Sequence, residues 1–189
     1  DDNTAIGWNA LFNNRTGLKN KAIGSGAPFH GSCANYNTTI VHQALNNNDT
    51  GANNNAVGAF ALLNNASGFY NNAYGREALL NNVGGTENEA FGDQALLNNL
   101  GDHNIAVGDQ ALVSNTTGNA NTAVGRQSGN SIINGHDNVT IGHFAGSSFV
   151  PSPNNIAIRA PGEGPYADTV NTSILGRTHA VDVWNTRRP

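Results

Sequence analysis

Residues 54–87 read NNAVGAFALLNNASGFY-NNAYGREALLNNVGGTE, which is two consecutive copies of one 17-residue unit. The unit can be written N-x-A-[IV]-G-x-x-A-L-x-N-N-x-T-G-x-x, and its first Asn recurs along the chain. The recurring positions are spaced by 17 residues, apart from two steps of 16, and are Asn3, Asn20, Asn37, Asn54, Asn71, Asn88, Asn104, Asn121, Asn138, Asn155 and Asn171. A register kept over so many copies predicts a repeat architecture in which equivalent residues stack.

Composition narrows the class of protein. Of 189 residues, 33 are Asn and 23 are Gly. Both residue types disfavour helix interiors, which argues against a helical bundle. No apolar stretch approaches the roughly 18 residues needed to span a membrane. The net charge of -4, with scattered Lys and Arg, argues against a nucleic-acid-binding protein. The single Cys33 has no partner for an intrachain disulfide.

Each unit carries two short apolar segments. The third position is always small and the fourth always apolar, and an Ala-Leu pair follows a Gly, as in Ala61-Leu62. Neither segment approaches the roughly 12 residues at which a helix becomes even marginal. Both suit strands of 3–5 residues, with the fourth position, including Tyr74 and Phe91, facing inward. We therefore expect an all-β fold, a parallel β-solenoid or β-roll of about eleven 17-residue coils.

The recurring Asn suggests a structural role. Stacked side-chain amides can donate and accept hydrogen bonds along a column and form a ladder. Asn also tolerates the left-handed backbone conformation that turns require. We expect the eleven Asn named above to form a structural ladder and not a binding site.

The thin apolar interior bears on assembly. With one large apolar residue and Ala in each segment, a single coil buries little area at roughly 25 cal/mol per Å², while backbone ordering costs on the order of 1–2 kcal/mol per residue. Coils packed around a common axis would use each apolar column twice. A homotrimer is therefore expected, with a lone solenoid or a polymer as the alternatives.

Several copies of the unit resemble a known group of surface proteins. Residues 121–125 (NTAVG), 138–142 (NVTIG) and 155–158 (NIAI) are similar to the head repeats of YadA-type trimeric autotransporter adhesins. The longer unit that begins at Asn3 resembles repeats of phage-like tail fibres. The resemblance covers roughly residues 3–147 and implies a trimeric parallel β-roll used for attachment or as a fibre shaft. The unit here is longer than the YadA-type repeat, so strand and turn positions do not transfer.

The pattern loosens towards the end of the chain. Residues 1–147 are expected to form the regular repeat β-roll. Residues 148–189 contain two loops rich in Pro and Gly and are expected to form irregular terminal coils. Terminal repeats of a solenoid are atypical because they close the stack, so this segment is either a cap or a junction to another subunit.

No set of residues indicates catalysis. The acids Glu77, Asp93 and Asp109 share variable columns with basic and aromatic residues, and no GxSxG, HExxH or phosphate-binding motif is present. His103 and His136 lie two coils apart, too far for one tetrahedral ion. We expect no enzyme activity, no metal and no cofactor.

Binding is the function that the pattern favours. The positions after the Gly vary strongly in chemistry while their neighbours do not, as expected of an outward surface. Aromatic side chains at outward positions can stack on sugar rings, and the candidates are Trp8, Phe60, Phe69 and Tyr70. We expect an extracellular, cell-surface or virion-surface attachment fibre or adhesin segment, with itself and a glycan or cell-surface receptor as partners. A purely structural filament subunit without a ligand is the alternative.

Overall fold

The computed structural model describes residues 2–26, 34–147, 153–158 and 170–172, and these form an all-β chain without a helix. Every strand is three residues long except β10, which has four. The strands are β1 (Thr4–Ile6), β2 (Lys21–Ile23), β3 (Thr38–Ile40), β4 (Asn55–Val57), β5 (Asn72–Tyr74), β6 (Glu89–Phe91), β7 (Ile105–Val107), β8 (Thr122–Val124), β9 (Val139–Ile141), β10 (Asn155–Ile158) and β11 (Val170–Thr172).

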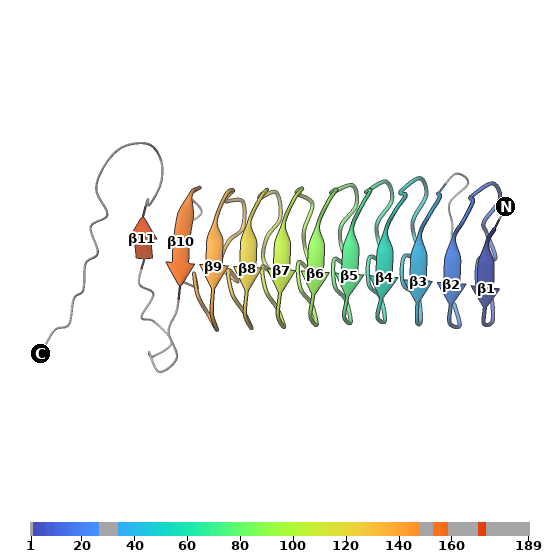
Figure 1. Ribbon diagram of the computed structural model, residues 1–189, viewed down its shortest axis with the longest axis horizontal. Helices are drawn as coiled ribbons and strands as arrows, with labels where there is room; N and C mark the ends of the chain where they lie inside the picture. Colours follow the sequence, from blue (N-terminus) through green and yellow to red (C-terminus); the bar gives the residue numbers. More distant parts are fainter. Residues whose placement is uncertain (1, 27–33, 148–152, 159–169, 173–189) are drawn as a thin grey trace, which may run out of the picture.

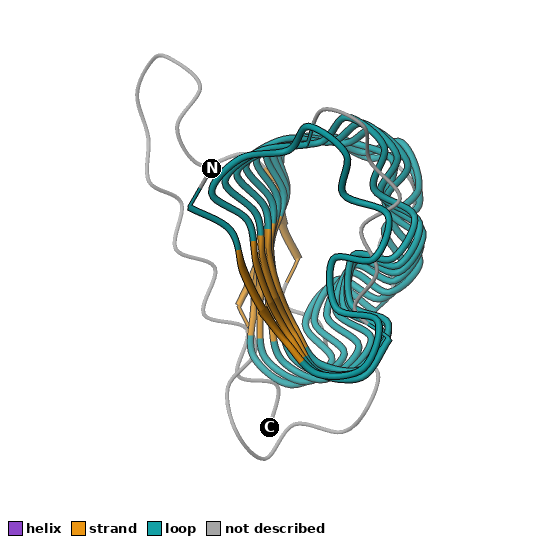
Figure 2. Cartoon of the chain, turned by 90° about the vertical axis from the view of Figure 1, so that its right-hand side faces the viewer, coloured by secondary structure: helices purple, strands orange, loops and turns teal. Residues whose placement is uncertain are grey.

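These strands form one sheet in strict sequence order (Figure 1). From β1 to β10 every pairing is parallel, and each residue lies beside its equivalent in the next repeat, as Ala56 lies beside Ala73. Viewed along the stack, the sheet forms one wall and the turns close the coil opposite it (Figure 2). The predicted parallel β-solenoid is confirmed, with strands β1 to β10 in the parallel stack where about eleven coils were expected.

The eleventh repeat departs from the prediction. Strand β11 runs antiparallel to β10, and Asn171 lies opposite Ile156 and not beside Asn155. The ladder register expected for Asn171 is therefore wrong, because a reversed strand cannot stack equivalent residues. Most of residues 148–189 lie outside the described ranges, as does Cys33, so the assignment of a cap or junction stays a prediction.

Among the described residues, only the first apolar segment of a unit forms a strand, so the expected second strand is wrong. Leu62 and Leu79 have φ angles of 51° and 53°, in the left-handed region that a strand excludes. The coil must turn sharply here, and the left-handed residues make that turn. Coils still bond to one another at this level, since the N–H of Leu62 donates to the carbonyl of Ala78 at 2.9 Å.

The strands face the opposite way from the expectation. The middle residue of strands β2 to β9, and Ala157 in β10, points inward. Most fourth-position residues, Tyr74 and Phe91 among them, are exposed, and Ile40 and Val57 are half-buried. Leu62 and its equivalents reach the interior from the turn and fill the space that the fourth position was expected to fill. The core is therefore two columns of small residues and one of Leu; its buried apolar members include Ala56, Ala61, Leu62, Ala73, Ala78, Leu79, Ala90, Ala95, Leu96, Ala106, Ala111, Leu112 and Ala123.

A ladder of buried amides runs beside this core. The Nδ2 of Asn71 donates to the carbonyl of Gly85 at 2.8 Å and to Oδ1 of Asn54 at 3.1 Å. Its Oδ1 accepts the backbone N–H of Asn88 at 3.0 Å. Each side chain thus ties its own coil closed and also binds both neighbouring coils. Bonds of this kind connect the recurring Asn from Asn3 to Asn155.

A second buried Asn column lies in the turn. Asn82 donates to Oδ1 of Asn65 at 2.9 Å and to the carbonyl of Gly85, three residues ahead, at 2.9 Å. In the 16-residue repeat the equivalent Asn99 reaches Gly101, only two residues ahead. The residue missing from that repeat is therefore lost in the turn, and the strand register is kept.

One coil replaces both the Leu and the second buried Asn. Gly129 stands 17 residues after Leu112, and Ile132 stands 17 residues after Asn115. Ile132 is buried, and its Cδ1 lies 3.3 Å from where a Cβ on Gly129 would be. Ile132 therefore occupies the space that the missing Leu leaves. Its side chain cannot donate a hydrogen bond, so Oδ1 of Asn115 is buried without a partner.

Candidate functional site

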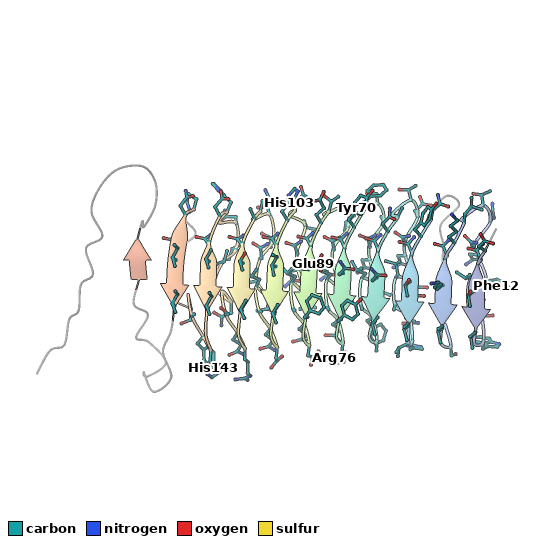
Figure 3. The ribbon with its side chains drawn as sticks, in the orientation of Figure 1. Phe12, Tyr70, Arg76, Glu89, His103 and His143 are labelled. Atoms are coloured by element: carbon teal, nitrogen blue, oxygen red, sulfur yellow. The ribbon has the colours of Figure 1, made fainter. Side chains whose placement is uncertain are left out.

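Two outward columns meet where each coil enters its strand. In the coils of β4, β5 and β6, the residue just before the recurring buried Asn sits in a left-handed turn. The residue just after that Asn is the first residue of the strand. In three successive coils these pairs are polar or aromatic, and together they line one shallow groove of about 490 Å³: Asn53 with Asn55, Tyr70 with Asn72, and Glu87 with Glu89. Tyr70 and Glu89 lie on the same side of the solenoid (Figure 3). We call this the β4–β6 groove.

The turn residues of the groove are held by the stack. Tyr70 has a φ of 58°, and its backbone N–H donates to the carbonyl of Ala52 in the preceding coil at 3.1 Å. Glu87 has a φ of 56° and donates in the same way to Phe69 at 3.0 Å. Because backbone bonds between coils fix both residues, their side chains start from rigid positions.

A directed chain of hydrogen bonds forms the floor of the groove. Asn55 Nδ2 donates to Oδ1 of Asn72 at 2.6 Å, and Asn72 Nδ2 donates to Oε1 of Glu89 at 2.8 Å. The chain ends on a carboxylate, which only accepts. In the described part of the protein, the second carboxylate oxygen of Glu89 makes no hydrogen bond. The floor therefore offers fixed amide groups and one open acceptor.

Histidine and acid side chains continue beyond the groove. Nε2 of His103 lies 3.4 Å from Oε2 of Glu87, and Oδ1 of Asp102 accepts the backbone N–H of Thr86 at 2.7 Å. The next strand begins with Ile105, which is exposed and apolar. The polar floor therefore ends at Glu89.

The other end of the strands, just after each strand's last residue, carries a column of charged side chains. Arg76 pairs with Asp93 at 3.1 Å, and Arg126 pairs with Asp109 at 3.2 Å. The hydrogen bond and the charge of Asp93, followed by the charge of Glu77, raise the pKa of the Arg76 guanidinium above its ordinary value. Such exposed pairs contribute little stability. Figure 3 shows Arg76 and Tyr70 at opposite ends of the strands.

The outward face of the sheet carries a stripe of apolar side chains, one from the last position of each strand. We call it the strand-face stripe; its members are Ile6, Ile23, Ile40, Val57, Tyr74, Phe91, Val107, Val124, Ile141 and Ile158. Eight of them are between 38% and 59% exposed. Near its middle, Tyr74 and Phe91 stack with ring centroids 4.9 Å apart and planes within 4°. An unbroken apolar column of this length is unusual on a monomer surface.

The four predicted aromatic residues do not form one site. Trp8 is 75% exposed and follows β1, and Phe60 follows β4, where it makes an edge contact with His42. Phe69 and Tyr70 precede β5, at the other end of the strands. Of the four, the β4–β6 groove includes Tyr70 alone.

Sequence reasoning missed the other five lining residues of the groove. Their signal was present, because polar residues recur two positions apart in three successive repeats. The sequence prediction placed the binding positions after the Gly, and these positions lie at the other end of the strands from the groove. The described residues contain no group of three His, Cys, Asp or Glu side chains placed to hold a metal ion.

Comparison of the chain with protein-family models, with curated proteins and with solved structures finds no match. In the described ranges there is also no helix of a length and hydropathy suited to crossing a membrane.

Proposed function

We propose that this chain is a non-enzymatic segment of an extracellular attachment fibre or adhesin, which binds a receptor on a cell surface through variable outward side chains. The observation that carries the proposal is the contrast between a constant interior and a varied exterior. Coil after coil repeats Ala, Leu and Asn inside. Outside, the column that follows the Gly position of the repeat holds Trp8, His42, Arg76, Asp93 and His143.

This contrast suits binding better than catalysis. A stack held by backbone and amide bonds accepts almost any outward side chain without loss of the fold, so each coil can be adapted to a partner separately. The resemblance to YadA-type heads and tail-fibre repeats points in the same direction.

We further propose that the chain assembles as a homotrimer through the strand-face stripe. Ten strands at about 4.8 Å spacing give a stripe roughly 43 Å long. Exposure of this apolar surface to water is unfavourable, and the surface is buried when the equivalent stripes of several copies pack together.

The mass of the chain in solution tests the assembly. Val107→Asp with Val124→Asp places two charges in neighbouring strands of the stripe, and we expect the mass to fall from three chains to one. Thr117→Asp, at an exposed turn position, is the matched control and should leave the mass unchanged. A wild-type protein with the mass of one chain at tens of micromolar contradicts the trimer.

Attachment and the purely structural filament differ in what they bind. For an attachment segment, we expect the labelled chain to bind cells or a glycan array, and the binding to weaken on substitution of outward aromatic residues such as Trp8 or Tyr70. Long polymers in electron micrographs, without binding to any cell or glycan, favour the filament instead.

A further inference from the structure

We propose that the β4–β6 groove is a carbohydrate-binding subsite for a neutral pyranose. This inference rests on the proposed attachment function and names the ligand class of one site within it. The groove combines an aromatic side chain, a row of amides and acceptor oxygens on rigid backbone, which are the groups that bind a sugar ring.

Tyr70 supplies the stacking surface. The residue is 57% exposed, while its backbone is fixed by the bond to Ala52. An aromatic ring presents an apolar face to the axial C–H groups of a pyranose and retains a hydroxyl group for hydrogen bonding. Because the turn is already ordered by the stack, little conformational entropy is lost when the sugar binds.

The floor supplies directional hydrogen bonds. The bonds from Asn55 to Asn72 and from Asn72 to Glu89 fix the orientation of each amide, and so the direction in which its Nδ2 and Oδ1 point. Each amide nitrogen has a second N–H, and Glu89 has a second oxygen that is open among the described residues. Neighbouring sugar hydroxyl groups both donate and accept, so they match this alternation.

The charge of the groove selects against acidic sugars. Two carboxylates, Glu87 and Glu89, line it, and among the residues that the structure describes no Lys or Arg does. A sialic acid, uronic acid or sulfate group placed there would be repelled by both. A neutral hexose or N-acetylhexosamine meets no such penalty.

The repeat offers a matched control for the test. Tyr36 occupies the same column as Tyr70, with a φ of 57° and 53% exposure, but lies outside the groove beside Lys19. Ala120 occupies that column too, with a φ of 54°. The backbone therefore accepts Ala there, and both Tyr70→Ala and Tyr36→Ala are expected to fold.

The experiment begins with an array of neutral, sialylated and sulfated glycans. The affinity of each variant for the most strongly bound neutral oligosaccharide is then measured by calorimetry. We expect Tyr70→Ala to weaken binding about tenfold or more, Tyr70→Phe to retain most of it, and Tyr36→Ala to stay within about twofold of wild type. Glu87→Gln with Glu89→Gln should admit acidic glycans.

Each contrary result has a distinct meaning. Preference of the wild type for acidic glycans, or equal effects of Tyr70→Ala and Tyr36→Ala, overturns the groove assignment and leaves attachment standing. Binding to cells without binding to any array glycan does the same. A wild-type chain that binds neither cells nor glycans overturns the proposed function as well.

Discussion

The buried amide ladder can be tested by removing one rung. Asn71→Ala deletes four hydrogen bonds of a fully buried side chain: those from its Nδ2 to Gly85 and Asn54, and those that its Oδ1 accepts from the backbone N–H and Nδ2 of Asn88. Three of the four partner groups keep another bond. The backbone N–H of Asn88 is left with no acceptor among the described residues.

The magnitude follows from those partners. An orphaned buried donor costs about 1–3 kcal/mol, and each remaining bond contributes a net of about 1 kcal/mol. We therefore expect Asn71→Ala to lower the free energy of unfolding by about 4–6 kcal/mol. Asn81→Ala is the matched control, since its side chain donates to Asn98 and accepts from Asn64 on the half-exposed surface. Water can replace those bonds, so its cost should stay within about 0.5 kcal/mol.

Urea unfolding at one fixed protein concentration, followed by far-ultraviolet circular dichroism, measures both costs. With a slope of about 2–3 kcal/mol per molar urea, Asn71→Ala should lower the midpoint by roughly 1.3–3 M, and Asn81→Ala by less than about 0.3 M. Equal midpoints for the two variants would refute the reasoning, because the buried Asn would then contribute no more stability than an exposed Asn in a turn.

Further predictions concern the backbone and the core, each followed by the same unfolding measurement. Gly92→Ala should lower the free energy of unfolding by about 2 kcal/mol or more, because a Cβ would lie 2.4 Å from the carbonyl oxygen of Gly108. Gly84→Ala is the control and should be nearly neutral, because the nearest neighbour of its Cβ is a Ser side chain at 3.3 Å. Val41→Gly should raise stability by about 1 kcal/mol, since Val41 has a φ of 90° in a column that Gly24 and Gly58 hold in the neighbouring coils; a lower midpoint would contradict this. Leu79→Ala should cost about 2–5 kcal/mol because its side chain is fully buried, and an unchanged midpoint would count against the assigned core.

The spacing of the repeat was sufficient to predict the stack. Residues 17 apart can pair in register only if each repeat makes one full coil, so the parallel pairing of Ala56 with Ala73 follows from the sequence. The Asn column follows as well, because the same spacing places Asn54 beside Asn71. The reversal of β11 did not follow, because Asn171 keeps nearly the same spacing although its strand pairs antiparallel.

The tertiary structure decided which side of each strand is buried. A three-residue strand such as Asn72–Tyr74 exposes either its middle residue or its two ends, and hydrophobicity alone favoured burial of Tyr74. The turn determines the choice, because left-handed Leu62 and Leu79 fill the interior and leave room only for small residues at the middle of each strand.

The groove and the substituted coil depend on the fold in the same way. Tyr70 and Glu89 are 19 residues apart in the chain, and only coil stacking brings them to one surface. Likewise, Ile132 fills the space beside Gly129 because the coil folds back on itself. Repetition along the chain therefore determines register, whereas packing across the coil determines what lies inside and which outward residues meet, since that depends on side-chain volume and turn geometry together.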